Sequence, residues 1–242
     1  MKIALMCPTR NRKNKLLTLI ASLITTIKNR KNVCLVLGVD EDDPIINFYS
    51  YLENNLSFVE IVKFKNNGKF LGLSTMWNEM AKQIDADVYA MVGDDMAFMS
   101  PDWDVEIQKE FETGPKDNVL MVHCNDGMRG IGNKYEKVKP FCVNFFIHKK
   151  SIDAIGYFVE PYIENIHQDT WNQVVYDSLN RSKYRHDILI KHLHVSETKD
   201  KVDNITDNLE KLRVGIWDNN DWMKTYKTQL ESDIKKLQAL IK

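Results

Sequence analysis

The chain has 242 residues, 43% of them hydrophobic and 28% charged, and it is long enough to bury one sizeable core. Its 33 basic and 34 acidic residues leave a formal net charge of -1, which excludes a global basic field that would attract nucleic acid or an anionic membrane. The apolar start stops at Pro8, too early for a signal peptide or a membrane span. We therefore expect one soluble, cytoplasmic domain.

The first half of the chain alternates apolar runs with helical periodicity. Residues 2–6, 33–39, 58–64 and 87–92 are short apolar or β-branched runs that predict buried strands. Helical spacing follows the first strand, from Leu16 to Ile27, and returns over residues 73–84, while Pro44 can start a short helix. Strands that alternate with helices predict an α/β domain whose mostly parallel sheet is covered on both faces.

The second half is less regular. Residues 101–111 and 168–179 predict helices, and residues 119–124 and 141–148 predict strands. Residues 125–139, rich in Gly, Asn and Lys, are a candidate loop near a site, although an ordinary surface connection has the same composition. The tail carries one apolar stripe and predicts a C-terminal helix that packs on the domain or on a partner. The stripe consists of Tyr226, Leu230, Ile234, Leu237 and Ile241.

The four cysteines lie far apart inside apolar runs, and no two of them have the spacing of a metal site. They are Cys7, Cys34, Cys124 and Cys142. We predict that they are reduced core residues.

Polar clusters follow three of the predicted strands directly. Pro8-Thr9-Arg10 follows the first strand, Asp40 the second, and Asp94-Asp95 the fourth. Ligands of parallel sheets bind beyond the carboxyl ends of the strands, so we expect these clusters to converge on one edge. Two adjacent carboxylates there are costly to bury without a positive partner, and Mg²⁺ or Mn²⁺ with substrate phosphates would supply one. A turn or a cap explains the same pair without a metal.

Five segments, in this order and spacing, resemble the nucleotide-binding half of glycosyltransferase family 2. They are Cys7-Pro8-Thr9-Arg10-Asn11-Arg12, Gly38-Val39-Asp40, Gly72-Leu73-Ser74-Thr75-Met76-Trp77-Asn78, Gly93-Asp94-Asp95-Met96 and Pro101-Asp102-Trp103. The resemblance implies a single, Rossmann-like GT-A domain over residues 1–242. Residues 1–100 would bind the nucleotide sugar, residues 101–205 the acceptor, and residues 206–242 would form a helical tail.

The resemblance also implies roles for individual residues of the donor site. Nucleotide-sugar binding would fall to Pro8, Thr9, Arg10, Asp40, Asn78 and Asp94, with Asp40 at the base or ribose, Asp94 at the ribose, and Asp95 on Mn²⁺ or Mg²⁺. Two departures stand out. Trp77 occupies a position where the family commonly has arginine, and the DXD-like motif is Asp-Asp-Met, which leaves open which carboxylate contacts the metal.

Two further segments resemble later parts of such enzymes. Residues 164–169 resemble the acidic acceptor-site motif, in which Asp169 would be the catalytic base of an inverting transfer. An acid in the first turn of the following helix is the structural alternative for Asp169. GT-A enzymes often add a late histidine to the metal, and of His192 and His194 we choose His194. Lys199 and Lys201 could neutralise the leaving diphosphate.

The function predicted from these features is transfer of a hexosyl or pentosyl group from a nucleotide diphosphate sugar to an acceptor hydroxyl. The acceptor is expected to be a glycan or, as a second choice, hydroxymethylated bases of bacteriophage DNA, since a Lys- and Asn-rich chain suits an AT-rich bacterial or viral genome. Basic residues that could contact DNA phosphates, or simply form solvated faces, are Arg10, Arg12, Lys13, Lys15, Arg181, Lys183, Arg185, His186 and Lys191.

Two other functions stay open. A nucleotidyltransferase shares the acidic metal site at the sheet edge, but it usually has a glycine-rich loop after the first strand, where this chain has Pro-Thr-Arg-Asn-Arg. A binding module for sugar nucleotides or glycans that has lost catalysis is the third possibility, and only Trp77 supports it.

Overall fold

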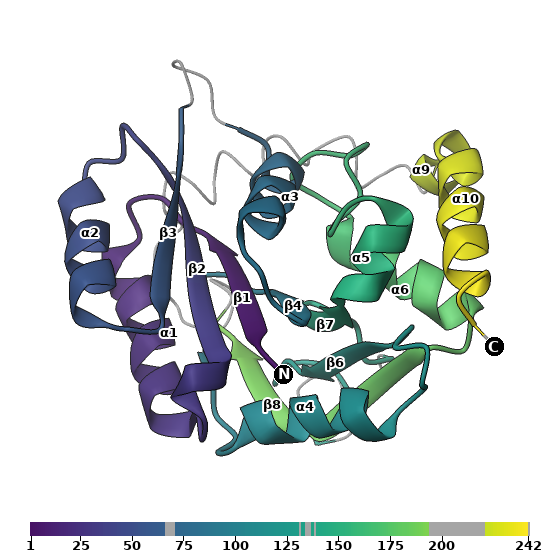
Figure 1. The fold of residues 1–242 in the computed structure, drawn as a ribbon, viewed down its shortest axis with the longest axis horizontal. Helices are drawn as coiled ribbons and strands as arrows, with labels where there is room; N and C mark the ends of the chain where they lie inside the picture. Colours follow the sequence, from purple (N-terminus) through teal and green to yellow (C-terminus); the bar gives the residue numbers. More distant parts are fainter. Residues whose placement is uncertain (66–70, 131, 134–136, 138, 194–220, 242) are drawn as a thin grey trace.

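The computed structural model describes residues 1–65, 71–130, 132–133, 137, 139–193 and 221–241. Its centre is an eight-stranded sheet with the strand order β3-β2-β1-β4-β7-β6-β8-β5 (Figure 1). The strands are β1 (Ile3–Pro8), β2 (Val33–Asp40), β3 (Val59–Phe64), β4 (Val88–Met91), β5 (Met96–Phe98), β6 (Met121–Asn125), β7 (Phe145–His148) and β8 (Ser182–His192). The helices are α1 (Lys13–Thr26), η1 (Arg30–Asn32), α2 (Ile46–Asn55), α3 (Leu73–Gln83), α4 (Trp103–Thr113), α5 (Lys149–Ile155), α6 (Gln168–Ser178), α9 (Trp222–Thr225) and α10 (Lys227–Gln238).

Helices cover both faces of the sheet, as the sequence predicts. Along β1 the side chains alternate between two separate apolar cores, with Ile3 and Leu5 in one and Ala4 and Met6 in the other. The first core lies under α1, α2 and α4, and the second under α3, α5, α6 and α10. Continuous apolar runs such as that of β2 are therefore buried on both faces, which is the usual reason that parallel strands lack alternation.

The sheet is parallel in its first half and mixed in its second. Strands β1 to β4 pair in parallel, whereas β7 runs antiparallel to both β4 and β6. Strand β8 is parallel to β6 and continues past it to pair antiparallel with β5. Elements β5, α5 and β8 were not predicted from the sequence, and β7 begins at Phe145 instead of residue 141. This is the α/β architecture that we expected, with a larger antiparallel share.

All four cysteines are buried and unpaired, in agreement with the prediction of reduced core residues. Burial raises the pKa of the Cys7 thiol well above its ordinary value, with the charges of Asp94 and Asp95 adding to the effect. Within the described part of the chain, no helix is both long and apolar enough to cross a membrane.

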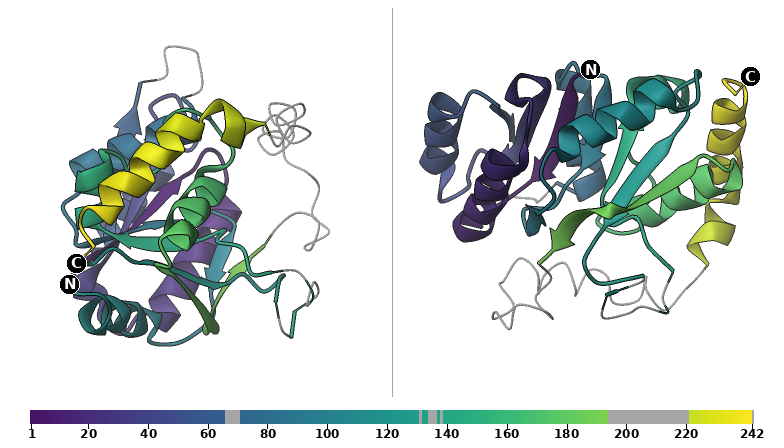
Figure 2. Two further views of the ribbon diagram at one scale, coloured as in Figure 1. Left: turned by 90° about the vertical axis from the view of Figure 1, so that its right-hand side faces the viewer. Right: turned by 90° about the horizontal axis from the view of Figure 1, so that it is seen from below.

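The C-terminal helix α10 packs along α5 and α6 (Figure 2). Leu230 and Leu237 of its stripe are buried against the second core. Asp233 lies between them with 1% of its surface exposed, and its Oδ2 accepts hydrogen bonds from the Tyr157 hydroxyl and, at 3.0 Å, from Trp171 Nε1. A buried polar contact therefore fixes the angle at which the apolar stripe docks.

Replacing Asp233 by Ala is expected to destabilise the protein by about 2–4 kcal/mol, because the buried Trp171 and the half-buried Tyr157 lose their shared acceptor. Urea unfolding followed by circular dichroism would measure the loss. The matched control is Glu231→Ala on the exposed side of α10, which should change stability by less than about 0.5 kcal/mol. Equal effects of the two substitutions would contradict the anchoring role of Asp233.

Candidate active site

The carboxyl ends of β1, β2 and β4 lie side by side, as predicted from the polar clusters. The register pairs Pro8 with Gly38 and Met6 with Met91, so the residues that follow these strands leave the sheet at one edge. The Thr9 amide extends the β1–β2 ladder by donating to the Gly38 carbonyl over 2.9 Å. Because all three segments start from paired backbone, their side chains are positioned by the sheet and not by loose loops.

Asp94 is as deeply buried as Asp40 at this edge, each with 4% of its surface exposed. The Thr9 hydroxyl donates to its Oδ2 over 2.8 Å, and Arg12 Nη1 donates to its Oδ1 over 3.1 Å. Burial raises the pKa of Asp94 to about 6, and the neighbouring charge of Asp95 adds to the rise, while Arg12 and the Thr9 hydrogen bond oppose it. The structure thus brings Thr9 and Asp94 together, as the sequence predicted.

Asp40 forms a second polar group at the end of β2. Arg10 Nη1 donates to Asp40 Oδ2 over 2.8 Å and also reaches Asp42. The other oxygen, Asp40 Oδ1, is buried and accepts no hydrogen bond from any described residue. Burial raises the pKa of Asp40, and its contact with Arg10 works in the opposite direction. A buried acceptor without a donor is costly, so a ligand N–H or O–H group would be favoured there.

Asp95 meets a histidine that comes from the far end of the sheet. His192 Nε2 lies 3.5 Å from Asp95 Oδ1, and the Leu193 amide donates to the Asp95 carbonyl over 2.7 Å. The pairing of β5 with β8, Met96 opposite His192, creates this contact. Burial alone would raise the pKa of Asp95, but the hydrogen bond and charge of His192, with Arg12, lower it below its ordinary value.

The donor set at Asp95 suits a hard divalent cation. Within the described residues no group of three or more His, Cys, Asp or Glu side chains is assembled as a complete metal site. A carboxylate and an imidazole 3.5 Å apart can both reach one ion, since adjacent ligands of an octahedral cation lie roughly 3 Å from each other. Mg²⁺ and Mn²⁺ commonly take one or two protein ligands and complete their shell with water and substrate phosphates. His194, which we predicted as a ligand, lies outside the described residues, as do Lys199 and Lys201.

Two residues of the third motif have contacts within the fold. The Asn78 side chain is buried, accepts from the amides of Phe158 and Val159, and donates to the Val159 carbonyl over 2.8 Å. Its amide is thus occupied in joining α3 to the α5–α6 connection. Trp77 packs in the second core, and its Nε1 donates to the Met6 carbonyl over 3.0 Å. Trp77, which stands where the family commonly has arginine, therefore fills space under β1.

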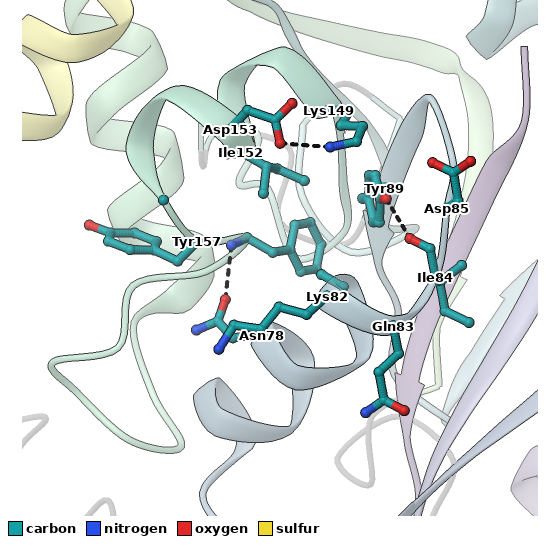
Figure 3. A pocket seen from close by; sticks show the side chains of 13 residues that line it. Asn78, Lys82, Gln83, Ile84, Asp85, Tyr89, Lys149, Ile152, Asp153 and Tyr157 are labelled. Atoms are coloured by element: carbon teal, nitrogen blue, oxygen red, sulfur yellow. Dashed lines mark hydrogen bonds and ion pairs between the residues drawn. The ribbon is translucent and has the colours of Figure 1, made fainter.

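A cavity of about 420 Å³ lies beside Asn78 (Figure 3). Its lining includes residues that precede β4, whereas Asp94 follows β4. Ile84 and Asp85, which precede β4, line it together with Lys149 and Asp153 of α5, which form an ion pair of 2.7 Å. Parallel sheets bind ligands at the carboxyl ends of their strands, so the acidic edge is the better candidate site.

Asp169 lies in the first turn of α6, where the helix dipole stabilises a negative charge. Its Oδ1 accepts from the Thr170 amide over 2.7 Å. The connection that leads into α6 is bound to the start of α3: Asn165 Oδ1 accepts from the Leu73 amide, and Glu164 accepts from Thr75. Since α3 follows the parallel strand β3, this contact brings the start of α6 toward the carboxyl edge of the sheet.

The backbone of this connection is unusual at two positions. Asn165 has a φ of 68° and His167 a φ of 71°, both in the left-handed region that residues other than glycine adopt infrequently. Such conformations persist where the surrounding structure enforces them, and they gather at functional sites. Earlier in the same connection, the buried Oε2 of Glu160 accepts the amides of Tyr162 and Ile163 over 2.7 and 2.8 Å, which fixes the backbone there.

Three basic residues in or just before β8 are paired with acids. Arg185 contacts Glu106 and Glu110 of α4, Lys183 also contacts Glu110, and Arg181 contacts Asp117. Arg10 and Arg12 face Asp40 and Asp94. These ion pairs stabilise the domain and the acidic edge. From the sequence we chose His194 over His192 as the metal ligand. The sequence feature that pointed to His192 was its spacing of two residues from His194, which puts both side chains on one face of an extended segment.

No protein-family model matches the sequence, and no curated protein does either. Among solved structures, a mannosyltransferase from Pyrobaculum calidifontis, PcManGT in complex with GDP-Man and Mn²⁺, matches with a TM-score of 0.63 and 10% identity over 99% of this chain and 73% of that chain. This chain has the GT-A glycosyltransferase fold.

Two other GT-A structures give similar results. S. aureus TarS 1–349 in complex with UDP-GlcNAc matches with a TM-score of 0.58 and 12% identity over 100% of this chain and 74% of that chain. GalNAc-T7 with UDP, GalNAc and Mn²⁺ matches with a TM-score of 0.62 and 11% identity over 80% of this chain and 43% of that chain. Against a longer TarS chain the match spans 36% of that chain, so this fold is one part of some larger proteins.

The pKa of Glu160 makes the connection before α6 sensitive to pH. Burial raises this pKa to about 8, and the Glu164 and Asp233 charges add to the rise, while the Ile163 and Tyr162 amides oppose it. Between the ordinary pKa of Glu and pH 8 the folded state therefore holds a proton that the unfolded state has released. The contribution of the Glu160 carboxyl to the free energy of unfolding is fully present below the ordinary pKa of Glu and is lost as the pH rises toward 8.

We expect Glu160→Gln to be more stable than the wild type at pH 9, by on the order of a few kcal/mol, and similar to it at pH 5. The amide keeps an oxygen for the two backbone donors and has no proton to lose. Thermal unfolding from pH 5 to 9 measures the difference, with exposed Glu112→Gln as the control. A gap that does not widen with pH would contradict the raised pKa.

Proposed function

We propose that this chain is a metal-dependent glycosyltransferase, which moves a hexosyl or pentosyl group from a nucleotide diphosphate sugar to an acceptor hydroxyl with inversion. The observation that carries the proposal is the acidic edge itself, where Asp94 is held by Thr9 and Arg12 and Asp95 meets His192. The GT-A fold puts this edge at the carboxyl ends of the strands, and solved structures with this fold contain GDP-Man, UDP-GlcNAc, UDP and Mn²⁺.

The donor would bind across the ends of β1, β2 and β4. Asp40 Oδ1, buried without a donor among the described residues, is suited to accept an N–H of the base or a ribose hydroxyl. Pro8, Thr9 and Arg10 would line the nucleotide, and Asp94 would face the ribose. Asn78 is left out of this donor site, because its amide groups are already bonded to the backbone of residues 158–159.

Asp95 and His192 would hold the Mn²⁺ or Mg²⁺ ion. A bound cation offsets the negative charge that develops on the departing diphosphate, and electrostatic stabilisation of this kind usually contributes most to the rate of such a reaction. His192 replaces His194 as our choice of histidine ligand, because the β5–β8 pairing brings it within 3.5 Å of Asp95. Arg12 adds a second positive charge at the same edge.

Asp169 would take the proton from the acceptor hydroxyl as that oxygen attacks the anomeric carbon. The start of α6, which carries Asp169, lies near the start of α3, because the Gln168 side-chain amide donates to the Ser74 hydroxyl. A glycan hydroxyl is our preferred acceptor. Hydroxymethylated bacteriophage DNA is less well supported, because acids already pair with Arg181, Lys183 and Arg185.

Replacing Asp95 by Asn is expected to lower turnover at least about 100-fold and to weaken metal-dependent donor binding, since the substitution removes a charged ligand. Nucleoside diphosphate release from UDP-, GDP-, CDP- and dTDP-sugars, with Mn²⁺ or EDTA, measures this. Release of pyrophosphate instead would favour a nucleotidyltransferase, and the absence of any binding or release would rule out the proposal.

Asp169→Asn is expected to reduce transfer about 10²- to 10⁴-fold and to leave nucleotide affinity unchanged, because a general base acts on the acceptor and does not contact the nucleotide. Calorimetry with UDP and GDP and a transfer assay would separate the two effects. Asp177→Asn, on the exposed side of the same helix, is the matched control. Full transfer by Asp169→Asn would show that the base is another residue.

A further inference from the structure

Asn11 lies between the two arginines of the first motif and has a left-handed backbone, with a φ of 52°. It is the residue at which the chain turns from β1 toward α1. On one side of it, Arg10 points to Asp40, and on the other, Arg12 points to Asp94. A left-handed residue reverses the local direction of the backbone, so this turn allows two arginines only two positions apart to reach the ends of different strands.

A buried pair of side chains holds Asn11 in this conformation. Its amide donates to Asp43 Oδ2 over 2.9 Å and to the Tyr49 hydroxyl over 3.1 Å. The Tyr49 hydroxyl in turn donates to Asp43 Oδ2 over 3.0 Å. Asp43 is 2% exposed and Tyr49 is fully buried, so water cannot replace these bonds without opening the core under α2.

Asp43 and Tyr49 fix the backbone between the two arginines that contact Asp40 and Asp94. Asp43 has a second task, because its Oδ1 accepts from the Ile45 amide at the start of α2. The Tyr49 hydroxyl joins Asp43 to the Asn11 amide and also has a hydrogen bond with the Thr9 side chain. Replacing Tyr49 by Phe removes this hydroxyl and leaves the bond from the Ile45 amide to Asp43 in place.

We propose that Tyr49, with Asp43, is a positioning residue of the donor site: it holds Asn11 left-handed and so presets Arg10 and Arg12 for a nucleoside diphosphate. The inference rests on the proposed function for the identity of the ligand. Without the Tyr49 hydroxyl, the left-handed conformation of Asn11 loses one of its two buried acceptors, and other conformations, in which the arginines are not preset, become more populated. The apparent affinity for the nucleotide then falls in proportion to the fraction of molecules that still have the binding conformation.

The test uses Tyr49→Phe, Asn11→Gly and the double variant, since glycine adopts positive φ without strain and does not need the anchor. The control is Tyr51→Phe, on the same helix and 63% exposed. Calorimetry with UDP, GDP, CDP and dTDP in Mn²⁺ gives affinities. Tyr49→Phe should bind the preferred nucleotide about fivefold more weakly, or about 1 kcal/mol, and the double variant should return to within about twofold of the wild type.

Hydrogen exchange at the Asn11 amide, measured without nucleotide, should accelerate in Tyr49→Phe and not in Tyr51→Phe. The positioning role is wrong if exchange is unchanged, if Tyr49→Phe binds like Tyr51→Phe, or if glycine at position 11 brings no recovery. Failure of the wild type to bind any of the four nucleotides would instead overturn the proposed donor site, while exchange at Asn11 would still decide whether Tyr49 holds the turn. Circular dichroism of each variant separates these results from unfolding.

Discussion

The buried carboxylate of Asp94 is the interaction on which the rest of the acidic edge depends. A carboxylate with 4% exposure is stable only when other groups satisfy its charge, and here Thr9 and Arg12 do so. This pairing joins the end of β4 to the turn between β1 and α1. Because β1 and β4 are in fixed register, neither partner can move away without disturbing the centre of the sheet. The arginine-rich turn is therefore part of the fold as well as of the candidate site.

The two adjacent acids differ in pKa because they face different surroundings. Burial raises the pKa of Asp94 to about 6, while His192 and Arg12 outweigh burial at Asp95 and lower its pKa. The proposed assignment of metal binding to Asp95, a choice that the motif Asp-Asp-Met left open, rests on its position 3.5 Å from His192 Nε2.

The second half of the sheet brings distant residues to this edge. Strand β8 crosses from β6 to β5, and its end delivers His192 to Asp95. The strand is hard to recognise in the sequence because its charged residues are partly buried by ion pairs to α4, so apolar and polar positions do not alternate. The same ion pairs account for basic residues that could otherwise be taken for a nucleic-acid surface.

The sequence by itself determined the α/β order of the first half and the convergence of Thr9, Asp40 and Asp94, because apolar runs followed by polar residues mark the carboxyl ends of parallel strands. Only the tertiary structure decided that His192 faces Asp95, that the Asn78 amide serves the backbone, and that Trp77 fills the core. Each of these depends on a contact across more than 70 residues of chain, as with Trp77 to Met6, separated by 71 residues. Local patterns carry no record of such pairings, since register and burial arise only when the whole sheet assembles.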